Sequence, residues 1–150
     1  GSWSPLLRQH GLMGDTGGGP IFLRSHCDSV QATLLCELGR WSDAEAILTR
    51  SIADFESLMP FGSWHPAITL ADLRIRQGRV AEAEMLLLGK DSALEALLPA
   101  ARLHLARGEH ALAIAAAGRG LRAIASDRMR AAELLAVMVE GLLLINTRIF

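Results

Sequence analysis

Apolar residues recur at intervals of three and four positions from Ile21 onward, the spacing that places them on one face of an α-helix. The spacing is interrupted by residues that end helices, which lie at Gly39, from Pro60 to Pro66, at Gly78, Gly89 and Gly108, and near Ser126. These breaks predict an all-α chain of about seven helices. The predicted helices cover residues 22–38, 42–58, 64–77, 80–88, 92–107, 110–125 and 127–145.

Three residues indicate where individual helices begin. Ser42 and Ser126 are of a type that caps helix N-termini well, and Ser42 forms a capping box with Glu45. Pro99 allows two interpretations of the fifth helix, because proline lacks the backbone N–H that a helix interior uses. Either this helix starts late with Pro99 in its first turn, or it starts near Ser92 and is kinked at the proline.

One short phrase occurs three times. It reads LGRWSDAEAIL at 38–48, QGRVAEAEMLL at 77–87 and, less closely, RGEHALAIAAA at 107–117. When Gly39, Gly78 and Gly108 are aligned, Ala stands seven positions before and five positions after each glycine, and Leu stands five before it. These residues are Ala32, Ala71 and Ala101, then Ala44, Ala83 and Ala113, and then Leu34, Leu73 and Leu103.

This register predicts a helix hairpin that is encoded three times. Alanine lets two helices approach closely, and leucine fills the seam between them. Each glycine is expected to take the left-handed conformation that ends a helix and reverses the chain. The glycines are 39 (78 − 39) and 30 (108 − 78) residues apart, which brackets the 34-residue period of a known helical repeat.

The pattern resembles tetratricopeptide repeats. Each unit of that family has a small residue in its first helix, a glycine before an apolar or aromatic residue at the turn, and an alanine in its second helix. The matching residues are Ala32, Gly39, Trp41 and Ala44; Ala71, Gly78, Val80 and Ala83; and Ala101, Gly108 and Ala113, where His110 stands at the turn. The family's early Trp and its closing Pro are absent, so the copies are degenerate. The resemblance implies an α-solenoid of antiparallel helix hairpins over residues 21–150.

A narrower resemblance comes from the segments CELGRWSDAEAIL, LADLRIRQGRVAEAEMLL and LHLARGEHALA. They are similar to the helical-repeat part of actinobacterial LuxR-type transcriptional regulators, in which a DNA-binding helix-turn-helix lies elsewhere in the polypeptide. The resemblance covers about residues 24–140. It implies a non-catalytic regulatory module that contacts a protein or peptide. The alternative is a freestanding peptide-binding adaptor, which needs no DNA-binding part.

Composition limits the kinds of partner and the cellular compartment that we expect. Fifteen Lys and Arg against 16 Asp and Glu give a net charge of −1, so we expect no direct nucleic-acid binding. Cys27 and Cys36 lie in one predicted helix, too far apart to form a disulfide, which indicates a reducing, cytoplasmic location. The apolar run at 134–145 contains Glu140 and is shorter than the ~20 residues of a spanning helix, so we expect no membrane segment. Residues 1–20 hold six glycines and two prolines and are expected to be a flexible segment.

No residue set predicts a catalytic, cofactor or metal site. His26, Cys27 and Asp28 are adjacent, but successive side chains of a helix point about 100° apart and cannot converge. His104 and His110 are six positions apart, not the four that would place two imidazoles on one helical face. We therefore do not expect an enzyme. Enzymatic activity would require His26, Cys27 and His65 to meet in one cleft.

The surface expected to bind a partner lies on the first helices of the hairpins and is called the first-helix face below. It comprises His26, Ser29, Thr33, Cys36, Glu37, His65, Ile68, Asp72, Ile75, Arg76, Glu95, Leu98, Arg102, Leu105 and Ala106. Asp72, Arg76 and Arg102 are its candidate anchors. Its mixture of both charges with apolar residues suits a peptide or a protein helix better than a nucleic acid. The alternative is that the face packs on its own neighbours and binds nothing.

The last predicted helix is expected to begin an incomplete fourth repeat. Its inner face would cap the third hairpin with Leu134, Leu135, Met138, Leu142 and Ile145. Further apolar residues extend around the helix and past its end, namely Val137, Val139, Leu143, Leu144, Ile149 and Phe150. Because such a surface is unfavourable in water, we expect a homodimer through this helix, or cover by another part of a longer protein.

Overall fold

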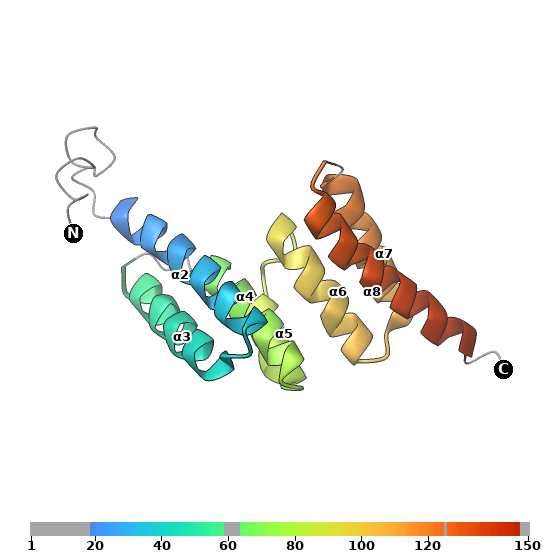
Figure 1. Cartoon of the computed structure of the whole chain (residues 1–150), viewed down its shortest axis with the longest axis horizontal. Coiled ribbons are helices and arrows are strands. Elements are labelled where there is room, and N and C mark those ends of the chain that lie inside the picture. Colours follow the sequence, from blue (N-terminus) through green and yellow to red (C-terminus); the bar gives the residue numbers. More distant parts are fainter. Residues whose placement is uncertain (1–18, 59–63, 125, 148–150) are drawn as a thin grey trace. The chain divides into compact units, whose positions relative to one another are not determined.

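The computed structural model describes residues 19–58, 64–124 and 126–147. These residues form seven α-helices, one short 3₁₀ helix and no strand, which confirms the all-α prediction for the described part of the chain. The elements are α2 (Gly19–Glu37), α3 (Trp41–Leu58), α4 (Trp64–Arg76), α5 (Val80–Leu87), η1 (Leu94–Ala96), α6 (Leu97–Ala106), α7 (His110–Ala123) and α8 (Arg128–Thr147) (Figure 1). None of these helices is both long and apolar enough to cross a membrane. Residues 1–18 of the predicted flexible segment lie outside the described residues, and Gly19 and Pro20 begin α2.

The chain divides into two compact units at Thr69, within α4. In the first unit, α2 and α3 pack side by side (Figure 1). In the second unit, α7 packs against both α6 and α8, and α6 also contacts α5 and η1. One core cluster of this unit consists of small and branched residues at or near α6, α7 and α8, namely Ala101, Ala116, Ala117, Ile124, Leu134 and Val137.

The three repeated turns have the same backbone geometry. Gly39, Gly78 and Gly108 all have φ of 76°, which confirms the predicted left-handed conformation. In each turn the glycine N–H donates to the carbonyl three residues back, over 3.0–3.1 Å, and the next N–H donates to the carbonyl five residues back, over 2.8–2.9 Å. This pair of bonds is a Schellman arrangement, which satisfies carbonyls that the end of a helix would otherwise leave unpaired.

The prediction that Ser42 caps α3 was wrong. The helix begins one residue earlier, at Trp41, and the carbonyl of Arg40 accepts the first helical bond from Ala44 N–H at 3.2 Å. Arg40 therefore both closes the glycine turn and opens the next helix, which leaves Ser42 inside the first helical turn. The side chain of Arg40 donates instead to Asp43 Oδ2 at 2.8 Å. The indole Nε1 of Trp41 donates to the last turn of α2, at the carbonyl of Cys36 (3.2 Å).

The predicted start of α8 was wrong by one residue as well. Asp127, and not Ser126, is the cap: its Oδ1 accepts from the N–H groups of Met129 (3.1 Å) and Arg130 (3.2 Å). A carboxylate also suits the positive end of the helix dipole better than a hydroxyl does. At α6 the first of the two interpretations is confirmed, because the helix begins at Leu97 and Pro99 lies in its first turn.

The aligned alanines are completely buried, whereas the aligned leucines are not equivalent. All six alanines have no exposed surface: Ala32, Ala71, Ala101, Ala44, Ala83 and Ala113. Leu73 and Leu103 are 1% and 6% exposed, as a seam residue should be, but Leu34 is 61% exposed. Leu103 lies on α6, which packs against α5, while the described residues contain no helix before α2. The expectation that Leu34 fills a seam was therefore wrong.

The faces of α8 also differ from the prediction. Leu134, Val137 and Gly141 are buried, so Val137 belongs to the inner face. Leu135 and Leu142 are 48% and 47% exposed and do not cap the preceding helices. Gly141 lies on the side of α8 that faces α7, and an added Cβ there would lie 3.0 Å from Ile114 Cγ1. Ile149 and Phe150 lie outside the described residues.

We expect Gly78→Ala to lower the free energy of unfolding by about 1–2 kcal/mol, the cost of the left-handed conformation for a residue with a Cβ. An added Cβ at Gly78 has no atom within 4 Å, so the effect would come from the backbone alone. Urea unfolding followed by circular dichroism measures the change. The control is Gly118→Ala in the middle of α7, where an added Cβ makes ordinary contacts at 3.5 and 3.7 Å and should raise stability by about 0.5–1 kcal/mol. Equal effects of the two substitutions would contradict the prediction.

Candidate functional site

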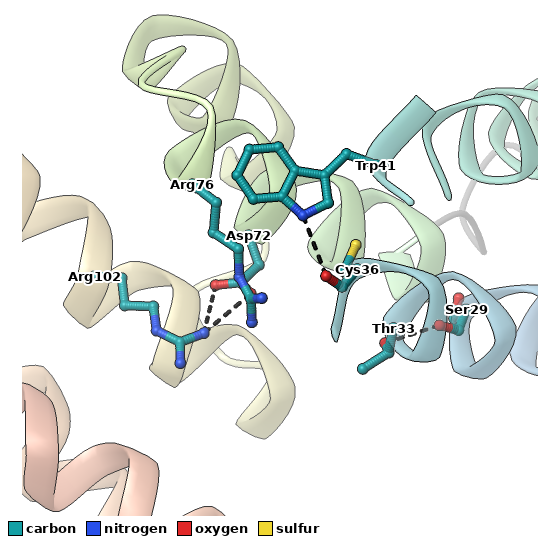
Figure 2. Close-up of polar contacts among 7 residues, drawn as sticks. All are labelled: Ser29, Thr33, Cys36, Trp41, Asp72, Arg76 and Arg102. Carbon is teal, nitrogen blue, oxygen red and sulfur yellow. Dashed lines mark hydrogen bonds and ion pairs between the residues drawn. The ribbon is translucent and has the colours of Figure 1, made fainter. Parts of the chain in front are cut away.

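On the first unit, the residues of the first-helix face lie along α2. His26, Thr33 and Glu37 are exposed, while Ser29 is buried. Both hydroxyls are used inside the helix: Ser29 Oγ donates to the Ser25 carbonyl at 3.0 Å, and Thr33 Oγ1 donates to the Ser29 carbonyl at 2.9 Å (Figure 2). The surface that α2 can present to a partner therefore comes from His26, Thr33 and Glu37.

The structure brings two of the five histidines together. The rings of His26 and His65 stand edge to face, with centroids 5.6 Å apart and an angle of 79° between their planes. Cys27 is exposed next to His26. Among the described residues, no group of three or more His, Cys, Asp and Glu side chains has an arrangement that could hold a metal ion.

The apolar members of the face contribute less surface than the sequence indicates. Ile68 is 5% exposed on α4. Leu98 and Leu105 on α6 are partly buried and pack against the core cluster of the second unit. Because the helices use these side chains for their own packing, any partner would meet mainly the polar residues of α4 and α6.

The three candidate anchors form one ion cluster in the second unit. Nη1 of Arg102 donates to both carboxylate oxygens of Asp72, at 2.8 and 3.0 Å (Figure 2). Nε of Arg76, one turn along α4, lies 3.3 Å from Asp72 Oδ2. The side chains of Asp72, Arg102 and Arg76 are 19%, 24% and 29% exposed. Two guanidinium groups thus share one carboxylate in a largely buried setting.

The pairing of Asp72 with Arg102 follows the repeat. Asp72 stands six residues before Gly78, and Arg102 stands six residues before Gly108. A second pair also joins consecutive copies: Nη1 and Nη2 of Arg107 donate to the two carboxylate oxygens of Glu84, at 3.0 and 2.8 Å. Sequence reasoning identified Asp72 and Arg102 as separate anchors and missed both pairs. The signal that could have found the first pair is the opposite charge in one repeat column.

Arg74 is the one buried arginine among the described residues, and it holds the turn between α4 and α5. Its Nε lies 3.1 Å from Glu82 Oε2, and its Nη1 donates to Gln77 Oε1 at 2.8 Å. Glu82 also pairs with Arg79, the residue after the turn glycine, at 2.7 Å. These contacts join Arg74 to residues on both sides of the turn.

His110 is the one described residue with a buried side-chain polar atom that lacks a hydrogen-bond partner. The residue is 9% exposed at the start of α7, and its Nδ1 has no partner among the described residues. It occupies the repeat column of Trp41 and Val80, where the other copies have largely apolar side chains. By contrast, His104 Nδ1 lies 3.1 Å from Glu109 Oε2.

We expect Asp72 and Arg102 to be energetically coupled by about 1 kcal/mol in a double-mutant cycle of alanine substitutions, because both are more than two-thirds buried. Chemical unfolding of the wild type, both single variants and the double variant gives this coupling. The control cycle uses Asp127 and Arg130, which are 3.5 Å apart and about half exposed, and its coupling should be close to zero. Additive effects at Asp72 and Arg102 would show that the cluster does not hold α4 to α6.

We expect His110→Leu to raise the free energy of unfolding by about 1 kcal/mol, because it removes an unpaired buried nitrogen while keeping similar volume. Thermal and urea unfolding measure the change. His104→Leu is the matched control, since it removes a nitrogen that does have a partner, and it should not stabilise the protein. A loss of stability in His110→Leu would indicate that the imidazole has a partner in solution.

No family model, no curated protein sequence and no solved structure matches this chain. What the chain does must therefore be inferred from its own residues. The features available for that inference are the repeated glycine turns, the buried alanine columns and the Asp72–Arg76–Arg102 cluster.

Proposed function

We propose that the chain is a non-catalytic helical-repeat module that binds a protein or peptide partner, within a LuxR-like transcriptional regulator. Its repeats would form an array of antiparallel helix hairpins of the tetratricopeptide kind. The binding residues would be those of the first-helix face that remain accessible, with Arg102 and Arg76 as the main anchors. DNA contact would come from a different part of such a regulator.

Contacts between equivalent positions support the array. In stacked repeats, each unit touches the next through residues in the same or nearby columns. Asp72 and Arg102 occupy the same column of consecutive copies and are in direct contact. The pair of Glu84 and Arg107 joins α5 to the end of α6, so the first helix of one copy contacts both helices of the copy before it.

The observation that carries the binding proposal is the partly exposed guanidinium group of Arg102, which is held beside Asp72. Arg102 uses only Nη1 toward Asp72, and its Nε and Nη2 make no hydrogen bond among the described residues. A partner carboxylate could accept from these N–H groups of Arg102. Charge-assisted bonds of this kind are strong and directional, so they would fix the register of an acidic peptide segment.

A freestanding peptide-binding adaptor is the alternative, and it would use the same residues. The full reading frame that encodes the chain separates the two: a helix-turn-helix with a basic recognition helix supports the regulator, and its absence supports the adaptor. The edge-to-face pair of His26 and His65 is the one feature that would favour an enzyme. Rapid alkylation of Cys27, which reports a thiolate, would revive that possibility.

We expect peptides selected by the chain from a random display library to carry an acidic residue next to apolar residues. Fluorescence anisotropy with a selected peptide should show at least a tenfold loss of affinity in the Arg76→Ala, Arg102→Ala double variant, which is about 1.4 kcal/mol. Binding by the wild type should weaken as salt is raised, because the pairs are only partly buried.

Arg119→Ala is the control, since Arg119 is an exposed arginine of α7 outside the first-helix face. It should bind the peptide as the wild type does. Circular dichroism must first show that each variant is folded. Selection of peptides without acidic residues, or equal affinity of the double variant and the wild type, would mean that the proposed face is wrong.

A further inference from the structure

The outer face of α8 is apolar over most of its described length. Leu135, Val139, Leu142 and Leu143 are 48%, 53%, 47% and 59% exposed. With the exposed Ala132 and Ala136, they form a continuous stripe on the side opposite the buried Leu134, Val137 and Gly141. These six exposed residues are called the α8 stripe below. A stripe of this size, roughly 400 Å² of apolar surface, is at the level that marks an interaction site on a protein surface.

Comparison with α6 shows what kind of element fits this stripe. On α6 and the residue before it, Ala96, Pro99 and Leu103 are buried with spacings of three and four residues, and Leu134, Val137 and Gly141 are buried on α8 with the same spacings. In this alignment Leu98, Ala101 and Leu105 correspond to Ala136, Val139 and Leu143. The three α6 residues belong to the core cluster that contains Ala116 and Ala117 of α7. The α8 stripe therefore corresponds to the face of α6 that packs against a neighbouring helix.

The spacing along the stripe indicates that this other helix can be a second α8. Ala132, Leu135, Val139, Leu142 and Asn146 follow one another at alternating intervals of three and four, which is the seam of two packed helices. The flanking positions on this side are Ala136 and Leu143, so two copies of the seam meet without like charges across it. A helix with such a seam is complementary to itself, as a two-fold interface requires.

The charges at the two ends of α8 indicate whether two paired copies of this helix run parallel or antiparallel. The first turn of α8 contains Arg128 and Arg130 and no acidic residue, and its last turn contains no basic residue. Apart from the capping carboxylate of Asp127, this is the reverse of the distribution that the helix dipole favours. An antiparallel partner corrects it, because the arginines of one copy then lie beside the carbonyl end of the other.

We infer that two copies of this chain associate through the α8 stripe, with their α8 helices antiparallel and crossing near residue 137. In this register Leu135 of one copy packs against Val139 of the other, and Ala132 packs against Leu142. Arg128 of each copy then lies near Asn146 and the last carbonyls of its partner. The total apolar area buried, roughly 800 Å², is below the ~1,200 Å² of stable specific interfaces, so the dimer is weak and forms and dissociates with concentration. The inference goes beyond the proposed function, because α8 carries no residue of the first-helix face.

Sedimentation equilibrium at tens of micromolar should give twice the 16.1 kDa mass of the chain. The double variant Leu135→Glu, Leu142→Glu should be monomeric at the same concentration. Val30→Glu, Leu34→Glu is the matched control, since these α2 residues are 49% and 61% exposed outside the stripe, and it should remain dimeric. A monomeric wild type would overturn the inference and would leave the stripe for another protein or another part of a longer chain. A dimer lost only in the α2 variant would overturn it as well.

Oxidative cross-linking tests the direction, in a Cys27→Ser background that removes the exposed native thiol. Ala132→Cys and Leu142→Cys proteins should cross-link when mixed, and neither should cross-link alone. In the antiparallel register two Leu142 positions are about 15 Å apart, too far for a disulfide. Efficient cross-linking of Leu142→Cys alone would show a parallel pair and overturn the assigned direction. The Arg76→Ala, Arg102→Ala variant should remain dimeric, so failure of the dimer and failure of peptide binding can be told apart.

Discussion

Helices joined by only three residues can pack against each other only if the backbone between them turns sharply. In this chain a glycine with φ of 76° provides that turn three times. Each turn is closed by the same two hydrogen bonds. The helix after each turn therefore leaves it in the same direction relative to the helix before it. The alanines seven before and five after each glycine are then completely buried. Larger side chains at these positions would force the helices apart, which links the turn to the packing of each unit.

The parts of the fold that the sequence predicts well are those set by this local geometry. Helix positions, the left-handed glycines and the buried alanines depend on residues close together in the chain, and each was predicted within a few residues. The helix starts were less predictable, because Arg40 has two roles that no single propensity describes: it closes one turn and opens the next helix. Whether a leucine of the aligned column is buried depends on elements that are distant in the sequence. Leu34 and Leu103 occupy the same repeat position, yet only Leu103 lies on a helix with another helix packed before it.

The candidate site was predictable as a set of residues but not as an arrangement. The resemblance to tetratricopeptide repeats, carried over position by position, placed Asp72, Arg76 and Arg102 on the first-helix face. Two guanidinium groups can share one carboxylate only at a suitable distance between α4 and α6. The packing of larger residues decides that distance. In addition, Ile68 is buried, and the hydroxyl of Ser29 donates a hydrogen bond to a carbonyl of its own helix. The surface left for a partner is consequently more polar than the sequence alone indicates.

The same kind of helix face is found in two settings in this chain. Within the chain, the face carried by Leu98, Ala101 and Leu105 is filled by a neighbouring helix and contributes to the core. At α8 the equivalent residues Ala136, Val139 and Leu143 have no such neighbour among the described residues and remain exposed. The chemistry of the face is unchanged, so its affinity for another apolar helix is unchanged too. The burial that stabilises α6 and the association that we propose for α8 would therefore have one physical origin, the removal of an apolar helix face from water.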